Sequence, residues 1–322
     1  MRTLLFSVVV CTHNRVDLLS QCLTSLVGQT LPAERYEIIV VDNRSADGTR
    51  IMVESFRQDH PAHQVVLIYE SELGLGWARN AGWRQARGEY VAFIDDDAKA
   101  DSRWLEHART CFEGIRPVPV AVGGPILPYY SESKPAWFKD EYELRTWGEH
   151  PRVLDPRESL SGSNMIFQKE VLERFGGFDV RVGMRGKRIS VGEETALFSR
   201  ITARYVGGLL YYSPHLVVYH VVGAGKMRAS YHVVRAFATG QVWYFLNGPR
   251  TFQERVRFLR TTLRTIKELT TTAMRQFLTF QDYRNWIIER VAPVALEMGR
   301  LVAGLGFCLP SWNKEAAADG DA

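Results

Sequence analysis

The chain has 322 residues, of which 46% are hydrophobic and 24% are charged, and its formal net charge is +4. This composition excludes a disordered chain and provides enough apolar surface for one large domain or two modest ones. The four cysteines include no C-x-x-C pair, which argues against a disulfide framework or a zinc site and favours free thiols in a reducing compartment. The N-terminus runs directly into an apolar strand pattern, so we expect no signal peptide.

Short β-branched runs alternate with helical patterns from the N-terminus onward. We expect strands over residues 6–11, 36–41, 65–69 and 90–94, and helices over 16–27, 49–59, 77–86, 104–112, 193–205 and 230–245. This alternation predicts an α/β fold in which helices cover a mostly parallel sheet. Ligands bind beyond the carboxyl ends of the strands in such sheets, so polar clusters at those ends should converge on one crevice.

Three consecutive acids, Asp95, Asp96 and Asp97, follow the apolar strand pattern of residues 90–94. Hard divalent cations such as Mg²⁺ bind oxygen ligands and leave positions open for substrate phosphates. The alternative is an acidic loop or a helix cap. The Asp-Ser pair at residues 101–102 is a better N-cap for the next helix. The triplet is therefore not needed as a cap, and we predict that it binds a metal.

Two further polar clusters belong to the same predicted edge of the sheet. Asp42 ends the second strand and could accept the imino proton of a pyrimidine base, with Thr12 on the other side of the ring. A plain turn over residues 42–48 is the alternative. Arg79 and Asn80, near a helix N-terminus, could face a ribose or diphosphate, or Arg79 could be an ordinary surface residue.

Motifs of other nucleotide-binding classes are not present in the sequence. Residues 74–79 begin like G-x-G-x-x-G, but the last position is Arg79 and the segment follows the third strand. The pattern G-x-x-x-x-G-K-[ST] does not occur. A nicotinamide cofactor and ATP bound by a P-loop are therefore both disfavoured.

The C-terminal region carries the basic character of the chain. Residues 250–300 contain ten Lys or Arg and five Asp or Glu. Apolar residues recur there at helical spacing: Val256, Leu259, Leu263, Ile266 and Leu269. Such a helix could pack on the body of the protein or lie on an anionic membrane surface. Residues 291–309 are apolar but include a proline and charged residues, which argues against a spanning helix.

Several ordered segments together resemble the family-2 glycosyltransferases. They are residues 8–15 (VVVCTHNR), 40–49 (VVDNRSADGT), 78–82 (ARNAG), 88–97 (GEYVAFIDDD), 162–165 (GSNM), 176–179 (GGFD), 192–194 (GEE), 212–214 (YSP) and His220. The resemblance covers about residues 5–222 and implies a glycosyltransferase A fold, a nucleoside-diphosphate sugar donor, a divalent metal (Mg²⁺ or Mn²⁺) and inversion at the anomeric carbon. It implies a catalytic domain over residues 1–225, with a nucleotide-sugar-binding half (1–122) and an acceptor half (123–225), followed by a helical extension (226–322).

The resemblance also implies roles for individual residues. Asp42 resembles the acid that contacts the base, Asp95 lies toward the ribose and the metal, Asp97 ligates the metal, and Asp96 is the variable middle position of D-x-D. His220 resembles a histidine that some members add to the metal site, and a structural histidine is an equal alternative. Further donor contacts are expected from Asn14, Arg15, Asn43 and Ser45, and acceptor or diphosphate contacts from Trp137, Ser163, Asn164, Arg185 and Arg188.

The catalytic base in the resembling enzymes is the second acid of an E-D pair, which here reads Glu193-Glu194. Glu194 is the expected base and Glu193 the second candidate. Alternatively, both acids only favour the N-terminus of their helix. The glycine-rich basic loop at 181–189, which holds Arg185 and Arg188, is interpreted as a lid over the diphosphate or as a solvated loop. Trp137 could stack on an acceptor sugar or anchor its own loop.

The resulting hypothesis is a metal-dependent inverting glycosyltransferase that moves a sugar from a UDP-sugar, or a dTDP-sugar, to a hydroxyl of a saccharide or lipid-linked acceptor in polysaccharide or glycan biosynthesis. We expect a cytoplasmic protein with peripheral contact to the inner face of the cell membrane and no nucleic-acid partner. A sugar-1-phosphate nucleotidyltransferase is one alternative, although residues 11–15 lack its glycine-rich loop. The other is a catalytically silent nucleotide-sugar-binding module, because Glu194 replaces the usual Asp.

Overall fold

The computed structural model describes residues 4–155, 158–180, 192–204, 209–249 and 251–307. The chain divides into two compact units. The first comprises residues 1–129, 143–181 and 193–221, and the second comprises 130–142, 182–192 and 222–322. Each unit is described separately.

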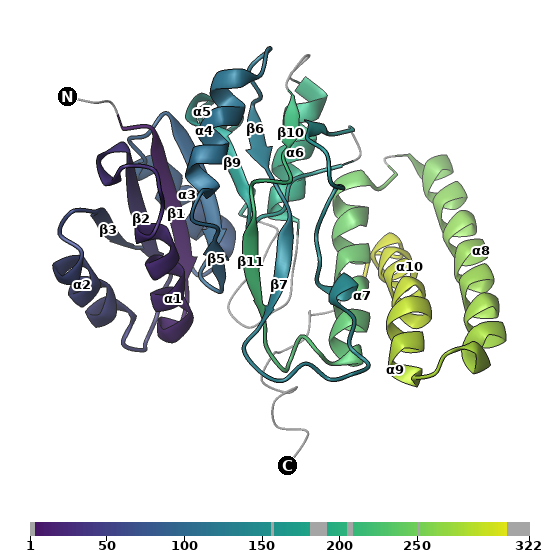
Figure 1. Ribbon diagram of the computed structural model, residues 1–322. Coiled ribbons are helices and arrows are strands. Elements are labelled where there is room, and N and C mark those ends of the chain that lie inside the picture. The colour runs from purple at the N-terminus through teal and green to yellow at the C-terminus, as the bar shows by residue number, and fades with distance from the viewer. Residues whose placement is uncertain (1–3, 156–157, 181–191, 205–208, 250, 308–322) are drawn as a thin grey trace. The chain divides into compact units, whose positions relative to one another are not determined.

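Parallel strands form the N-terminal part of the first unit (Figure 1). They are β1 (Phe6–Thr12), β2 (Tyr36–Asp42), β3 (Gln64–Tyr69) and β4 (Tyr90–Asp95), in the spatial order β3-β2-β1-β4. The helices between them are α1 (Val16–Val27), α2 (Thr49–Asp59) and α3 (Leu75–Gln85). Each predicted strand and helix of this region is confirmed within two residues.

The remaining strands make the sheet mixed. Its full order is β3-β2-β1-β4-β9-β6-β10-β8, where β6 is Ala121–Gly123, β8 Arg152–Val153, β9 Met165–Gln168 and β10 Leu210–Tyr212. Strand β9 is antiparallel to both neighbours, and β8 is antiparallel to β10. The expectation of a mostly parallel sheet is confirmed, because the pairings among β1 to β4 and the pair β6 and β10 are parallel, and the antiparallel pairings are those of β9 and β8.

A second, three-stranded sheet has the order β5-β11-β7, with β5 at Ala98–Ala100, β7 at Ile126–Tyr130 and β11 at Val218–Val222. The sequence pattern did not predict β5, which is short and begins directly after Asp97. Strand β11 pairs with β5 in antiparallel register, and His220 lies opposite Ala98. This pairing brings His220 next to the acids that precede β5.

Hydrophobic side chains alternate between the two faces of the large sheet, as expected for strands buried on both sides. Val8 and Val10 pack in one cluster with α1 and α4 (Trp104–Gly114). Val9 faces the other cluster, which includes residues of α3, α5 (Lys169–Phe175) and α6 (Glu193–Arg204). Full burial of each such side chain contributes about 1.5–3 kcal/mol, so the strands that carry the site belong to the most strongly packed part of the chain.

The second unit contains a group of helices. They are α7 (Ala229–Asn247), α8 (Phe252–Gln276), α9 (Tyr283–Trp286) and α10 (Ala292–Gly304), with short helices η3 (Phe277–Thr279) and η4 (Ile287–Val291). Helices α7 and α10 approach closely at Gly240 and Gly299, where a Cβ on either residue would overlap the backbone of the other helix. None of the described helices has the length and apolar character needed to cross a membrane.

Candidate active site

Strand register places the expected donor residues side by side at one edge of the sheet. Thr12 lies opposite Asp42 across β1 and β2. Cys11 lies opposite Asp95 across β1 and β4. Because these strands are parallel, their carboxyl ends share one edge of the sheet, as the sequence pattern indicated.

Asp95, Asp97 and His220 form a compact group of metal-ligating side chains. One ligand atom from each lies within 4.8 Å of the others. The Nε2 atom of His220 is 3.1 Å from Asp97 Oδ1 and 3.9 Å from Asp95 Oδ2. Two carboxylates and one imidazole are a suitable donor set for a divalent cation such as Mn²⁺, so these residues fit a metal ion.

Two arginines bind the opposite oxygens of the same carboxylates. Arg79 Nη2 donates to Asp95 Oδ1 at 3.2 Å, and Arg15 Nη1 lies 3.2 Å from Asp97 Oδ2. The oxygens directed at His220 are the other member of each carboxylate. The arginines thus hold the two carboxylates in orientation and reduce the repulsion between them.

Asp96, the middle residue of the triplet, is buried and hydrogen-bonded within the chain. Its side chain accepts hydrogen bonds from the Thr12 hydroxyl at 2.8 Å and from Arg15 at 2.9 Å. Burial raises the pKa of Asp96, although the Arg15 guanidinium acts in the opposite direction. Thr12 and Arg15, both expected to contact the donor, are therefore also held by Asp96.

Arg79 is buried among acids, which corrects the alternative of an ordinary surface arginine. It is 3% exposed and donates to Glu193 Oε1 at 2.8 Å and to the Gly162 carbonyl at 3.1 Å. Burial alone would lower the pKa of Arg79, but the Glu193 and Asp95 carboxylates raise it above its ordinary value. A Cβ at Gly162 would lie 2.7 Å from Arg79 Nη2, so the glycine makes room for the guanidinium.

The two candidate bases begin α6 and have different surroundings. Glu193 is 3% exposed, and burial together with the Glu194 carboxylate raises its pKa, while Arg79 opposes this change. Glu194 is half-buried, and its Oε2 atom has no hydrogen-bond partner within the described chain. The Oε2 atom of Glu193 likewise has no hydrogen-bond partner among the described residues. The two acids therefore differ in the bond that Arg79 makes to Glu193 and in the greater exposure of Glu194.

The loops after β1 and β2 are linked to each other. Asn14 has a left-handed backbone (φ 53°); its N–H donates to the Ser45 hydroxyl, and its Oδ1 accepts from the Ala46 N–H. Asp42 Oδ1 accepts from the Ser45 N–H at 2.8 Å. The turn interpretation of residues 42–48 is confirmed, and among the described residues the Asp42 side chain accepts this hydrogen bond through Oδ1 alone.

Three asparagines that were expected to contact donor or acceptor are engaged in internal hydrogen bonds. Asn43 bonds the backbone of Glu70, Glu72 and Gly74. Asn80 bonds the backbone of Phe178 and the Trp83 indole. Asn164, fully buried, bonds the Trp104 indole and two carbonyls. Buried amides satisfied in this way hold the surrounding backbone in place, and the ligand contacts expected of these side chains stay predictions.

The other expected acceptor residues are placed differently. Ser163 is buried, and its Oγ atom has no hydrogen-bond partner in the part of the chain that the structure describes. Trp137 belongs to the second unit, where it packs against the Phe138 cluster and lies under the Arg284 guanidinium at 4.7 Å. Arg185 and Arg188 lie outside the described residues.

The sequence model of glycosyl transferase family 2 matches residues 7–176. The chain belongs to this family. The matched segment contains β2 to β4, all of β1 except its first residue, and Asp95–Asp97. Glycosyl transferase family 2 membership makes the chain a glycosyltransferase.

Solved structures confirm the glycosyltransferase A fold with a helical C-terminal region. One is a mannosyltransferase from Pyrobaculum calidifontis in complex with GDP-Man and Mn²⁺, with a TM-score of 0.61 at 20% identity, covering 94% of this chain and 88% of that one. Another is residues 1–349 of TarS from Staphylococcus aureus with UDP-GlcNAc, with a TM-score of 0.55 at 17% identity, covering 94% and 92%. At these identities the likeness establishes the fold alone.

Curated relatives of this family-2 chain include named transferases and biosynthesis proteins. The glucosyl-dolichyl phosphate glucuronosyltransferase of Haloferax volcanii is 28% identical over 244 residues, which are 73% of this chain and 74% of the relative. The succinoglycan biosynthesis protein ExoM of Rhizobium meliloti is 26% identical over 250 residues, which are 74% of each chain.

Proposed function

We propose that this glycosyltransferase is metal-dependent and inverting, and that it moves a sugar from a nucleoside-diphosphate sugar to an acceptor hydroxyl. The convergence of Asp95, Asp97 and His220 at the carboxyl ends of the strands supports this proposal. These three residues would hold Mg²⁺ or Mn²⁺. A divalent cation there would offset the negative charge of the departing diphosphate.

Glu194 is the proposed base that accepts the proton of the attacking hydroxyl. Its greater exposure supports this role, because a general base must reach the hydroxyl of the acceptor, whereas Glu193 is buried and bound to Arg79. Glu193 is proposed to orient the start of α6 through Arg79. The departure from the usual Asp at position 194 is then a difference in side-chain length alone.

Asp42 and Thr12 are proposed to face the nucleotide base. The two residues lie opposite each other in the register of β1 and β2, which supports one shared site for the nucleotide base. We favour a UDP-sugar, with a dTDP-sugar as the second choice, because both bases present the same imino group to a carboxylate. The similar structures hold UDP-GlcNAc in one case and GDP-Man in another, so a test of donors should include guanine nucleotides.

The acceptor is proposed to be a saccharide or a lipid-linked sugar in polysaccharide or glycan biosynthesis. The names of the Haloferax and Rhizobium relatives, one with a dolichyl phosphate and one with succinoglycan, support this class. We propose a catalytic domain over residues 1–225 and a helical extension over 226–322. The extension would bring a cytoplasmic enzyme into peripheral contact with the inner face of the cell membrane.

A thermal-shift screen with Mn²⁺ and UDP-, dTDP- and GDP-sugars tests the donor site. At ~100 times its dissociation constant, the correct donor should stabilise the fold by about 2.7 kcal/mol, and EDTA should remove that gain. Asp97→Asn should lose the gain, whereas the control Asp17→Asn, on the first turn of α1, should keep it. If a donor stabilises the fold equally with and without EDTA, the proposed metal site is excluded. Failure of every wild-type sample to transfer sugar would exclude the enzymatic role.

A further inference from the structure

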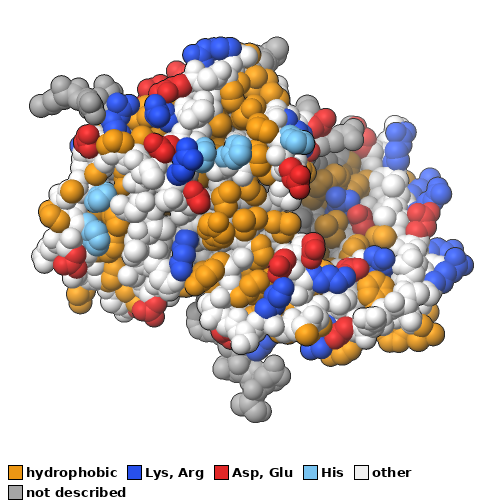
Figure 2. All heavy atoms as spheres, viewed as in Figure 1, with side chains coloured by type: hydrophobic (Ala, Val, Ile, Leu, Met, Phe, Trp, Pro, Cys, Tyr) orange, Lys and Arg blue, Asp and Glu red, His pale blue; other side chains and the backbone are white. Residues whose placement is uncertain are grey.

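The outward face of α8 combines exposed hydrophobic side chains with a row of basic ones. Among the described residues, ten of the exposed large hydrophobic side chains lie between positions 245 and 307, and only six lie in the rest of the chain. Figure 2 shows Lys and Arg side chains gathered over α8, which Figure 1 labels. Apolar side chains gathered in this way mark an interaction surface.

Three exposed apolar residues of α8 and the half-buried Val256 form a stripe along the helix. Phe252, Val256, Leu263 and Met274 fall within about 40° of one another around the axis at 3.6 residues per turn. Phe252 is 80% exposed, Leu263 53% and Met274 74%. The buried residues Thr262 and Ala273 lie about 60–120° from this stripe around the axis. The stripe therefore borders the packed side of α8, and its exposed members Phe252, Leu263 and Met274 remain open to solvent.

Basic residues run beside this stripe. Arg257, Arg260, Arg264 and Lys267 occupy the adjoining arc, about 60° to 140° from Phe252 around the axis, and all four are exposed. The acid next to this arc, Glu268, is paired with Arg264 at 2.8 Å. The arc thus has a net positive charge along almost three turns.

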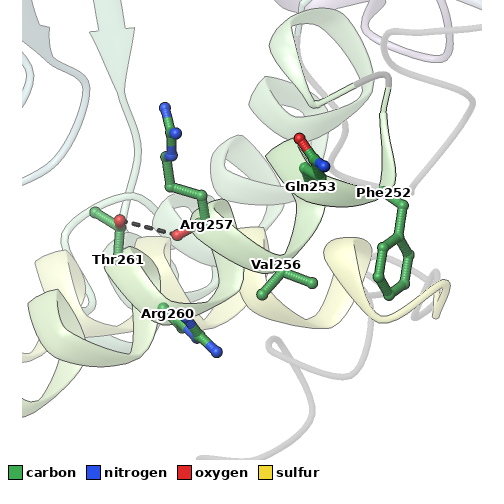
Figure 3. A pocket seen from close by; sticks show the side chains of 6 residues that line it. All are labelled: Phe252, Gln253, Val256, Arg257, Arg260 and Thr261. Carbon is green, nitrogen blue, oxygen red and sulfur yellow. Dashed lines mark hydrogen bonds between the residues drawn. The ribbon is translucent and has the colours of Figure 1, made fainter.

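A shallow hollow of about 430 Å³ lies at the N-terminal end of the same face. Its lining consists of Phe252, Gln253, Val256, Arg257, Arg260 and Thr261. In Figure 3, Phe252, Val256 and Arg260 project to the same side of the helix. Apolar and cationic groups thus line the same depression. The apolar groups suit the acyl region of a lipid, and the cationic groups suit its phosphate.

We propose that this face of α8 docks the enzyme on an anionic lipid bilayer. The apolar stripe enters the boundary between headgroups and acyl chains, and the basic row contacts lipid phosphates. A bilayer explains the face better than a nucleic acid does, because a polyanion in water would leave the apolar stripe exposed. The inference rests on the proposed peripheral membrane contact and assigns that contact to one helix face.

Vesicle co-sedimentation of the full chain tests this docking face. The vesicles contain phosphatidylglycerol and phosphatidylcholine in equal amounts, or phosphatidylcholine alone. Wild type should bind the first and bind the second weakly. Arg260→Gln/Arg264→Gln should weaken binding to anionic vesicles by roughly 25-fold, because each cation near the surface contributes a factor of about five.

Helix α2 offers matched controls. Arg50→Gln/Arg57→Gln removes the same charge from exposed positions, and Arg50, like Arg264, is paired with a glutamate four residues later. Phe252→Ser is matched by Ile51→Ser, which alters an α2 side chain that is 75% exposed. Both α2 variants should bind vesicles as wild type does, while Phe252→Ser should bind more weakly.

The outcomes separate this inference from the broader proposal. If wild type binds no vesicles, both the membrane contact and the docking face are wrong. If it binds and the α8 variants behave like the α2 controls, the contact stands and the face assignment fails. Light scattering compares the oligomeric state of wild type and Phe252→Ser. If wild type is a dimer, the variant is a monomer and both bind vesicles equally, the face is a contact between two copies and the inference is overturned. Transfer to a soluble acceptor, measured on the same variants, should be unchanged.

Discussion

Arg79 Nη1 lies 2.8 Å from Glu193 Oε1, and both side chains are almost completely buried. The pair joins α3 to the first residue of α6 across 114 positions of sequence. The other end of the same guanidinium binds Asp95. One arginine therefore fixes both a candidate metal ligand and the helix that presents the candidate base.

Replacement of Arg79 tests this network. Arg79→Met should lower the free energy of unfolding by about 3–5 kcal/mol, because it leaves a buried acid without its partner. Urea unfolding in EDTA measures the change. Arg79→Met/Glu193→Leu should recover a large part of it, since both charged groups are then removed. Arg50→Met breaks an exposed ion pair with Glu54 and should cost no more than about 1 kcal/mol. A double variant as unstable as the single one would contradict the pairing argument.

Asp96 and Asp97 should respond to substitution in different ways. Asp97→Asn should abolish stabilisation by Mn²⁺ while the protein still folds. Asp96→Asn should lower the free energy of unfolding by about 1–3 kcal/mol, because the buried contacts to Thr12 and Arg15 lose their charge. Melting curves with and without Mn²⁺ measure both effects. An Asp96→Asn protein as stable as wild type would support the interpretation of Asp96 as a spacer.

The two glutamates should differ in kinetic effect. Glu194→Gln should reduce kcat by about 10²–10⁴-fold, the usual range for loss of a general base. Glu193→Gln should reduce it less, since an amide oxygen can still accept from Arg79. Glu194→Asp restores a carboxylate and should recover part of the rate. Turnover of Glu194→Gln equal to that of wild type would remove Glu194 as the base.

Asp47 should make stability depend on acid pH. Burial would raise the pKa of Asp47, but hydrogen bonds from Thr49 and from the Val16 N–H lower it below the ordinary value. A lowered pKa stabilises the fold above the unfolded-state pKa of about 3.9, and this contribution is lost as the pH falls through the folded-state value.

The difference in unfolding free energy between wild type and Asp47→Asn should therefore be constant from neutral pH to about pH 5 and should narrow below about pH 4. Urea unfolding at a series of pH values measures it. Thr49→Val removes the hydroxyl that donates to Asp47. In that background, the difference in unfolding free energy between Thr49→Val and Thr49→Val/Asp47→Asn should therefore fall less at low pH. A difference between wild type and Asp47→Asn that grows toward low pH would show that the pKa is raised.

The positions of Asp42 and Asp95 were predictable from the sequence because local pattern determines them. Each follows a run of β-branched or aromatic residues, and parallel strands place their carboxyl ends at one edge. His220 was identified only through the family resemblance. Its place beside Asp97 depends on β5, a strand of three residues that is too short to produce a recognisable period.

The asparagines show a kind of contact that the sequence pattern did not reveal. Asn80 and Asn164 stand within motifs of the family, and their polar side chains were interpreted as ligand contacts. In the folded chain they bond buried backbone groups and indoles. A sequence gives no sign of which polar residue binds a ligand and which satisfies a buried carbonyl, because both require the same donors and acceptors.

The sequence by itself determined the α/β order of the first unit, the acids at its strand ends and the helical, basic character of the C-terminal region, since each depends on neighbours within a few residues. Only the tertiary structure decided that Arg79 binds Glu193, that Asp96 is buried against Thr12 and Arg15, and which side of α8 remains exposed. These relations join distant segments, and burial strengthens them because charges separated from water interact more strongly.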